Sequence, residues 1–171
     1  MSADVQRLEA ASIIAAIKRA RISTIVVLPD RQTSQHLLRG LLDDPEMRVV
    51  QVCKEDEGVS ICSGLHATGQ RAMLLMQYTG LLDSINAIRG VAVELQNPVC
   101  MMVGLLGLEP GTPPVRSKRY GLRIVEPILD AMAVPHHLLV SSGDTYQIAP
   151  AIEAAYARSG PVVLLVGAEP A

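Results

Sequence analysis

The chain has 171 residues, of which 49% are hydrophobic and 19% charged, and its formal net charge is −2. With four Tyr and no Phe or Trp, this composition excludes proteins that bind nucleic acid through basic surfaces and aromatic stacking. The length suits one substantial core, and we expect a single domain over residues 1–171. The low charged fraction predicts that more surface is covered by assembly into a homodimer or a higher hetero-oligomer.

Membrane insertion and metal binding find no support in the sequence. No stretch reaches the ~18 apolar residues of a spanning helix, and the first residues lack the basic and then apolar order of a secretory signal. We therefore expect a cytoplasmic protein with no membrane association. Cys53, Cys62 and Cys100 lie in apolar segments without a Cys-x-x-Cys pair, which predicts buried free thiols. None of the four histidines has the spacing of a metal-ligand motif, so no metal site is predicted in this chain.

The predicted elements alternate between helices and short apolar strands. Helices are expected over about 5–17, 33–42, 56–68, 82–95, 123–132 and 145–157, and strands over 22–28, 48–53, 72–77, 99–103, 137–140 and 162–166. Continuous apolar strands separated by helices of about ten or more residues are typical of a parallel sheet covered on both faces. We predict an α/β fold, a three-layer sandwich with a mainly parallel sheet of about six strands.

One connection is too long for an ordinary crossover loop. Residues 105–120 contain three prolines and several glycines, and loops of this length are often functional or mobile. This segment carries Arg116, Lys118 and Arg119, whose charges suit an acidic substrate. The alternative is a solvated flexible loop.

An acidic cluster, Glu55, Asp56 and Glu57, lies between a predicted strand and a predicted helix. At ~100° per residue, Glu55 falls on the apolar face of that helix, whereas Asp56 and Glu57 point away from it. An inward carboxylate at such a junction suits proton transfer. The alternative is that all three acids merely favour the positive end of the helix dipole.

A second polar segment follows the strand predicted at 72–77. It begins Gln77-Tyr78-Thr79-Gly80, and we expect it to form a loop at the carboxyl end of the strand, the edge at which open α/β sheets bind ligands. Alternatively, Thr79 or Asp83 only caps the next helix, and Tyr78 is an ordinary half-buried aromatic residue. No glycine-rich phosphate loop and no Gly-x-Ser-x-Gly nucleophile elbow occurs in the chain.

These motifs together resemble a known family. Glu55 nine positions before Gly64, the stretch from Met76 to Leu81, and Ser84-Ile85-Asn86-Ala87 are similar to the pyrimidine-binding domain of thiamine diphosphate-dependent decarboxylases. Within that family, the chain most resembles the alpha subunits of sulfopyruvate decarboxylases and, next, phosphonopyruvate decarboxylases. Residues 125–131 are also similar, so the resemblance covers most of the chain.

The resemblance implies the thiamine diphosphate-binding fold and the decarboxylation of a small anionic 2-oxo acid. It assigns to Glu55 the hydrogen bond to the aminopyrimidine ring nitrogen, which favours the imino tautomer that deprotonates the thiazolium carbon. The candidate cofactor-binding residues are Glu55, Gln77, Thr79 and Gly80, and the candidate substrate-binding residues are Tyr78, Arg116 and Lys118.

Two departures from the family pattern qualify this interpretation. The family loop reads Gln-Asn-Ser-Gly-Leu-Gly-Asn, whereas this chain has Tyr78, Thr79, Leu82 and Asp83 at the differing positions, which favours a substrate of different shape or lower polarity. The Gly-Asp-Gly stretch that binds Mg²⁺ and diphosphate in the family does not occur here. The resemblance therefore implies a separate diphosphate- and metal-binding beta subunit. The rival hypothesis is a non-catalytic α/β structural or regulatory module that retains the fold.

Overall fold

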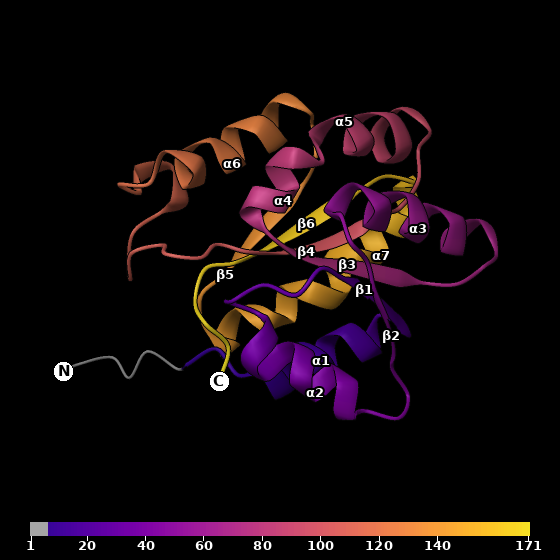
Figure 1. Ribbon diagram of the computed structural model, residues 1–171, viewed down its shortest axis with the longest axis horizontal. Helices are drawn as coiled ribbons and strands as arrows, with labels where there is room; N and C mark the ends of the chain where they lie inside the picture. Colours follow the sequence, from indigo (N-terminus) through magenta and orange to yellow (C-terminus); the bar gives the residue numbers. More distant parts are fainter. Residues whose placement is uncertain (1–6) are drawn as a thin grey trace.

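The computed structural model describes residues 7–171, which form a six-stranded sheet between two layers of helices (Figure 1). All strand pairs are parallel, and the strand order is β2-β1-β3-β4-β6-β5. The strands are β1 (Thr24–Val27), β2 (Arg48–Gln51), β3 (Ala72–Gln77), β4 (Cys100–Gly104), β5 (His136–Leu139) and β6 (Val162–Val166). The helical segments are α1 (Ala10–Arg19), η1 (Ser34–Leu38), α2 (Arg39–Asp43), α3 (Glu55–Ala67), α4 (Tyr78–Asp83), α5 (Ile85–Ala87), η2 (Ile88–Glu94), η3 (Pro114–Arg116), α6 (Tyr120–Ala131), η4 (Ser142–Gln147) and α7 (Ile148–Arg158).

Successive residues of the central strands enter two separate cores, because side chains alternate between the faces of a sheet. In β3, Met73 and Leu75 face α1, α2 and α7, whereas Leu74 and Met76 face α3, η2 and α6. The two helical layers lie on opposite sides of the sheet in Figure 1. Both faces are therefore dry, which explains the uninterrupted apolar runs in the sequence. The predicted three-layer α/β sandwich with six strands is confirmed.

Methionine fills the centre of the sheet. Met73, Met76, Met101 and Met102 in the neighbouring strands β3 and β4 are each at most 1% exposed. In a chain without Phe or Trp, the flexible thioether side chain can occupy irregular space between the strands and the helices.

Several predicted boundaries differ from the structure. Residues 78–81 were expected to form a loop, but α4 begins directly after β3, because tertiary contacts such as that of the Tyr78 ring with Gly121 outweigh the weak helical preference of this segment. The first helix begins at Ala10, since Glu9 is extended, and the expected start near Val5 lies outside the described residues. Cys62 and Cys100 are buried free thiols, and burial raises the pKa of each to about 12. The prediction for Cys53 was wrong, because this thiol is exposed two residues after the short edge strand β2.

The sheet has a topological switch point between β1 and β3. The connection that leaves β1 passes to the face covered by α1 and α2, whereas the connection that leaves β3 passes to the opposite face. Such divergence opens a crevice at the carboxyl ends of the two strands, where ligands of open α/β sheets bind. No helix among residues 7–171 is long and apolar enough to cross a membrane.

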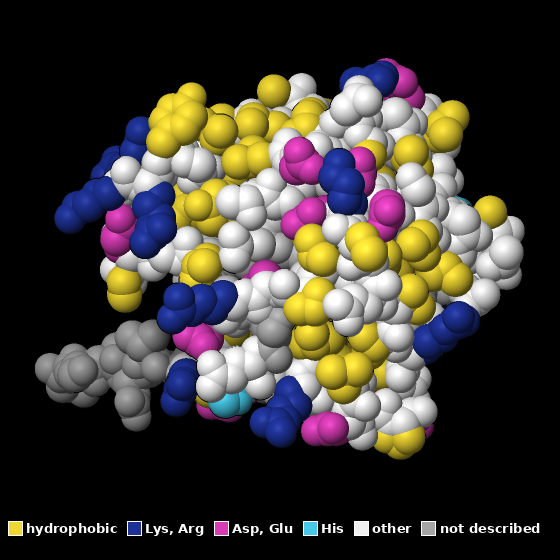
Figure 2. Space-filling model, viewed as in Figure 1, with side chains coloured by type: hydrophobic (Ala, Val, Ile, Leu, Met, Phe, Trp, Pro, Cys, Tyr) yellow, Lys and Arg dark blue, Asp and Glu magenta, His cyan; other side chains and the backbone are white. Residues whose placement is uncertain are grey.

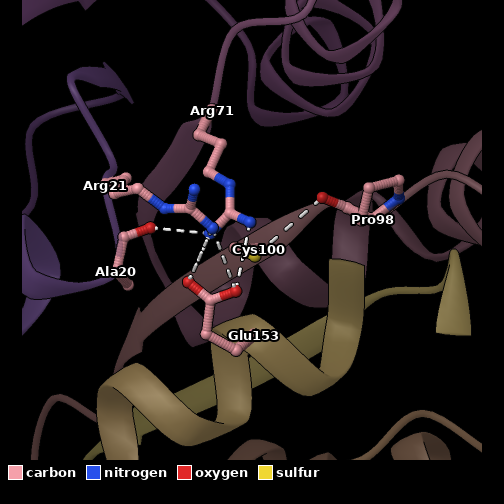
Figure 3. Close-up of polar contacts among 6 residues, drawn as sticks. All are labelled: Ala20, Arg21, Arg71, Pro98, Cys100 and Glu153. Atoms are coloured by element: carbon pink, nitrogen blue, oxygen red, sulfur yellow. Dashed lines mark hydrogen bonds and ion pairs between the residues drawn. The ribbon is translucent and has the colours of Figure 1, made fainter. Parts of the chain in front are cut away.

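An ion pair ties α7 to the amino end of the sheet, away from the switch point (Figure 3). Arg71, directly before β3, donates to both oxygens of Glu153 at 2.6 and 3.1 Å and to the carbonyl of Ala20 at 2.9 Å. Its guanidinium also lies 4.1 Å from the ring centroid of Tyr156. Arg21 also approaches Glu153, at 3.4 Å, and its guanidinium lies beside that of Arg71 in Figure 3. This cluster contributes to stability and lies at the edge opposite the carboxyl ends of the strands.

Glu153→Gln is expected to lower the free energy of unfolding by up to about 1 kcal/mol at neutral pH, because the pair is partly exposed. The hydrogen bond from Arg71 holds the pKa of Glu153 below its usual range. Such a group stabilises the fold above its unfolded-state pKa of about 4.3, and the effect is lost as the pH falls through the lower folded-state pKa. Urea denaturation followed by circular dichroism should therefore show the difference between variant and wild type shrinking below about pH 4. A difference that persists to about pH 2 would contradict the electrostatic explanation.

Candidate functional site

Two polar segments meet at the carboxyl edge of the sheet beside the switch point. Glu55 is the first residue of α3, which follows β2, and Gln77 is the last residue of β3, from which α4 departs. The start of α3 lies close to the sheet because Gly58 faces Leu74, and a side chain at position 58 would collide with that leucine. The two motifs that the sequence analysis singled out are therefore neighbours in space.

The three acids of the cluster have different surroundings. Lys54 forms ion pairs with Asp56 at 3.5 Å and with Asp83, at the end of α4, at 3.6 Å, and the negative charges of Asp56 and then Asp83 raise the pKa of Lys54. Glu57 accepts the backbone N–H groups of Cys53 and Lys54 at 3.2 and 3.3 Å. In Figure 2, a basic side chain lies among acidic ones above the junction of α3 and α4. Asp56 and Glu57 thus serve the helix start, as the dipole alternative requires.

Glu55 differs from its two neighbours. Its side chain is half-buried, as is that of Asp56, but its carboxylate accepts no hydrogen bond and forms no ion pair with any side chain in residues 7–171. It lies over Gly80 of α4, where the carboxyl group and Cγ occupy the space that a Cβ atom at position 80 would need. The predicted inward direction of Glu55 is confirmed, and the absence of a side chain at Gly80 makes its position possible.

The remaining candidates after β3 surround this contact. The Thr79 hydroxyl donates to Oε1 of Gln77 at 3.0 Å, so Thr79 orients Gln77 and does not cap α4. Asp83 does not cap the following helix α5 either, since the N-cap of α5 is Ser84, no side chain caps it, and Asp83 pairs with Lys54. The half-buried ring of Tyr78 lies against Gly121 in the first turn of α6, where an added Cβ would be 2.8 Å from Cε2 of the ring. Tyr78 therefore connects the site with the end of the long segment 105–120.

The cationic candidates lie on that segment. Arg116 ends η3, Lys118 follows two residues later, and both side chains are exposed. Arg119 lies with its guanidinium over Gly107, a glycine with φ +85° in the turn after β4. The segment is less irregular than expected, because Ser117 is buried and bonded to Glu109 at 2.8 Å. The bond from Ser117 therefore ties the middle of the segment to Glu109, while Arg116 and Lys118 lie in solvent, as the alternative of a solvated loop expects.

The sequence analysis missed one polar cluster at the same edge. Asp30, which follows β1, accepts the N–H groups of Gln32 and Thr33 at 2.6 and 2.8 Å and the hydroxyl of Thr33. Gln32 is buried and donates to the carbonyl of Val166 at the end of β6 at 2.8 Å. The carboxylate of Asp30 and the methyl group of Thr33 border Gly104 at the end of β4. An Asp two and three residues before its N–H donors is a local turn signal that the sequence already contained.

Two of the four histidines have structural surroundings. His66 lies edge-on to Tyr156, with 5.7 Å between the ring centroids, and His136 contacts the carbonyl of Val134 at 3.1 Å. In the part of the chain that the structure describes, no group of three or more His, Cys, Asp or Glu side chains is placed to hold a metal ion.

Comparison with known proteins gives a consistent set of relatives, although no family model matches the chain. The sulfopyruvate decarboxylase subunit alpha of Methanocaldococcus jannaschii is 27% identical over 158 residues, which are 92% of each chain. The sulfopyruvate decarboxylase subunit alpha of Methanococcus maripaludis is 34% identical over 71 residues, which are 42% of each chain. A sulfopyruvate decarboxylase of Methanosarcina acetivorans is 28% identical over 96 residues, which are 56% of this chain and 24% of that protein. The resemblance found in the motifs is confirmed by these relatives.

Proposed function

We propose that this chain, which is similar along nearly its whole length to a sulfopyruvate decarboxylase alpha subunit, is the pyrimidine-binding alpha subunit of a thiamine diphosphate-dependent 2-oxo acid decarboxylase. The observation that carries the proposal is the carboxylate of Glu55, which lies over Gly80 beside the switch point and has no partner among residues 7–171. The names of the relatives support an enzyme subunit of the sulfopyruvate decarboxylase type. The rival hypothesis of a non-catalytic module is not favoured.

The residues of this edge fit the pyrimidine end of the cofactor. A half-buried carboxylate with no partner in the described part of the chain is available to hold a proton at a ring nitrogen, and the bare backbone at Gly80 lets it reach this position. When bound, thiamine diphosphate supplies the electron sink for loss of carbon dioxide. Gln77, oriented by the Thr79 hydroxyl, is proposed to contact the same cofactor. The ring of Tyr78 helps to exclude water on the side toward α6.

A second subunit is proposed to complete the site by binding Mg²⁺ and the diphosphate. Two relatives are named as alpha subunits, and a name of this kind implies at least one further subunit. The Methanosarcina acetivorans relative carries no subunit designation and is much longer, since 96 matched residues are only 24% of it. Its additional length is consistent with one polypeptide that contains both parts.

The proposed substrate is a small 2-oxo acid with a second anionic group, for which a sulfonate is the first candidate. Arg116 and Lys118 are exposed cations on segment 105–120, the end of which meets Tyr78 through the first turn of α6. Arg and Lys side chains suit sulfonate and phosphonate groups. We propose that they bind the anionic end of the substrate while its ketone lies near Tyr78.

Reconstitution tests the proposal directly. The chain is mixed with the product of an adjacent gene that carries a Gly-Asp-Gly motif, thiamine diphosphate and Mg²⁺ are added, and carbon dioxide release from sulfopyruvate is measured. We expect turnover from the mixture and little from either protein alone. Absence of both cofactor binding and decarboxylation in a mixture that forms a complex would contradict the proposal. Full activity of this chain alone would contradict the requirement for a partner.

A further inference from the structure

The segment 105–120 is held in one shape by bonds that converge on three consecutive residues, 117–119. The carboxylate of Glu109 accepts the hydroxyl of Ser117 at 2.8 Å and the backbone N–H of Lys118 at 3.1 Å. The same Ser117 oxygen accepts the backbone N–H of Arg119 at 3.1 Å. From α6, Arg123 donates to the carbonyls of Ser117 and Lys118, both at 3.0 Å. Ser117 is only 2% exposed, so water cannot easily replace the partners of its hydroxyl group.

Glu109 is the one acidic side chain of the segment, and both of its carboxylate oxygens accept these hydrogen bonds. It forms no ion pair with the cations of segment 105–120. Arg116, Lys118 and Arg119 are exposed and form no ion pair among residues 7–171. By contrast, Lys18 and Lys54, which lie outside this segment, are each paired with two carboxylates. Lys and Arg side chains gather at the left end of the molecule in Figure 2, where the segment before α6 projects in Figure 1. The segment therefore presents excess positive charge on a fixed backbone.

We propose that Glu109 and Ser117 are positioning residues, which act through the backbone at 117–119 to hold Lys118 and Arg119 as a preformed subsite for the sulfonate or similar anion of the substrate. This inference rests on the proposed function and adds Arg119 to its substrate contacts. A preformed subsite binds the substrate more tightly than a flexible one, because ordering a flexible cationic loop on binding costs free energy and lowers the affinity. The hydrogen bond from Ser117 holds the pKa of Glu109 below its usual range.

Glu109→Gln tests the proposal by the sign of its effect on KM. Gln can accept only one of the two bonds that Glu109 accepts, because its second terminal atom is an N–H donor. We expect KM for sulfopyruvate in the reconstituted complex to rise about tenfold, with kcat within about twofold, if one positioning bond worth about 1.4 kcal/mol is lost. Simple electrostatic attraction predicts the opposite, since removing a negative charge beside the cations should lower KM. Ser117→Ala, which leaves the charge unchanged, is expected to raise KM by a similar factor.

The matched control is Glu94→Gln, which makes the same charge change in an exposed pair with Arg89 on η2 and should leave KM unaltered.

Limited trypsin digestion of the complex gives a readout that needs no turnover. Cleavage after residues 116, 118 and 119 should be faster in Glu109→Gln and Ser117→Ala than in wild type, and sulfoacetate should slow it in wild type.

The outcomes separate the two proposals. Equal cleavage of variant and wild type would overturn the positioning role even if the complex is an active decarboxylase. Faster cleavage of the variants with unchanged KM in an active complex would overturn the anion subsite. A wild-type complex that binds no cofactor and releases no carbon dioxide, while sulfoacetate still protects this segment, would contradict the proposed function and support the subsite.

Discussion

Glu55→Gln is expected to lower the turnover of the reconstituted complex by about 10²- to 10⁴-fold, the range typical of removing a general acid or base. The substitution keeps the size of the side chain and its place over Gly80, but the amide cannot take up a proton at neutral pH. The free energy of unfolding should stay within about 0.5 kcal/mol of wild type, because the carboxylate has no partner to lose among residues 7–171. Initial rates of carbon dioxide release at saturating substrate measure the effect.

Asp56→Asn provides a matched control on the same turn of the same helix. Asp56 is paired with Lys54 and not directed at Gly80, so the amide variant should keep turnover within about twofold and lose at most about 1 kcal/mol of stability. If Glu55→Gln retained turnover within a few-fold of wild type, the proton-transfer role of Glu55 would be wrong. Equal losses in both variants would point to the helix terminus as a whole and against one specific carboxylate.

Gly80→Ala is expected to reduce turnover nearly as much as the loss of the carboxylate itself. The new methyl group would occupy the space of the Glu55 carboxyl group and Cγ, so Glu55 must turn away from the site. Because the displaced atoms are the end of a flexible side chain, and Ala is a better helix former than Gly by roughly 0.5–1 kcal/mol, the fold should keep its stability. A large loss of activity without a loss of stability is the expected signature, measured by kinetics and urea denaturation of the same preparation.

Gly90→Ala is the matched control for that substitution. Gly90 also lies in a helical segment, η2, but an added Cβ there meets no atom within 4 Å. Turnover should be unchanged and stability should rise by up to about 1 kcal/mol. Full activity of Gly80→Ala would show that the position of Glu55 over residue 80 is not required for the reaction.

Most of the fold could be predicted from the sequence because burial on both faces of the sheet leaves a strong signal. Strands such as Ala72–Gln77 and Val162–Val166 are continuous apolar runs, and their bounds were predicted without error. The start of α4 was not predictable in this way, since Tyr78, Thr79 and Gly80 have little helical preference and are held in a helix by their tertiary surroundings. The strand order depends on contacts between segments distant in the sequence, which periodicity does not reveal.

Helical phase was enough to predict the part of the candidate site that lies within one helix. The parts that depend on contacts between distant segments were missed. Glu55 could be distinguished from Asp56 and Glu57 because all three share one helix. That its carboxylate would lie over Gly80, 25 positions later in the chain, could not be read from either segment alone. The bonds from Glu109 to the residues at 117 and 118 were missed for the same reason. The assignment of these residues to catalysis and substrate binding stays a prediction until the variants are measured.

Oxidation of the methionines at the centre of the sheet can be used to measure how often the whole fold opens. A peroxide can oxidise Met73, Met76, Met101 or Met102 only when β3 and β4 lose their cover of helices, since each of these thioethers is at most 1% exposed. Mass spectrometry of the tryptic peptides would then count opening events of the sheet in a chain that has no tryptophan to follow by fluorescence. Added partner subunit and cofactor should slow this oxidation to the extent that they stabilise the closed fold.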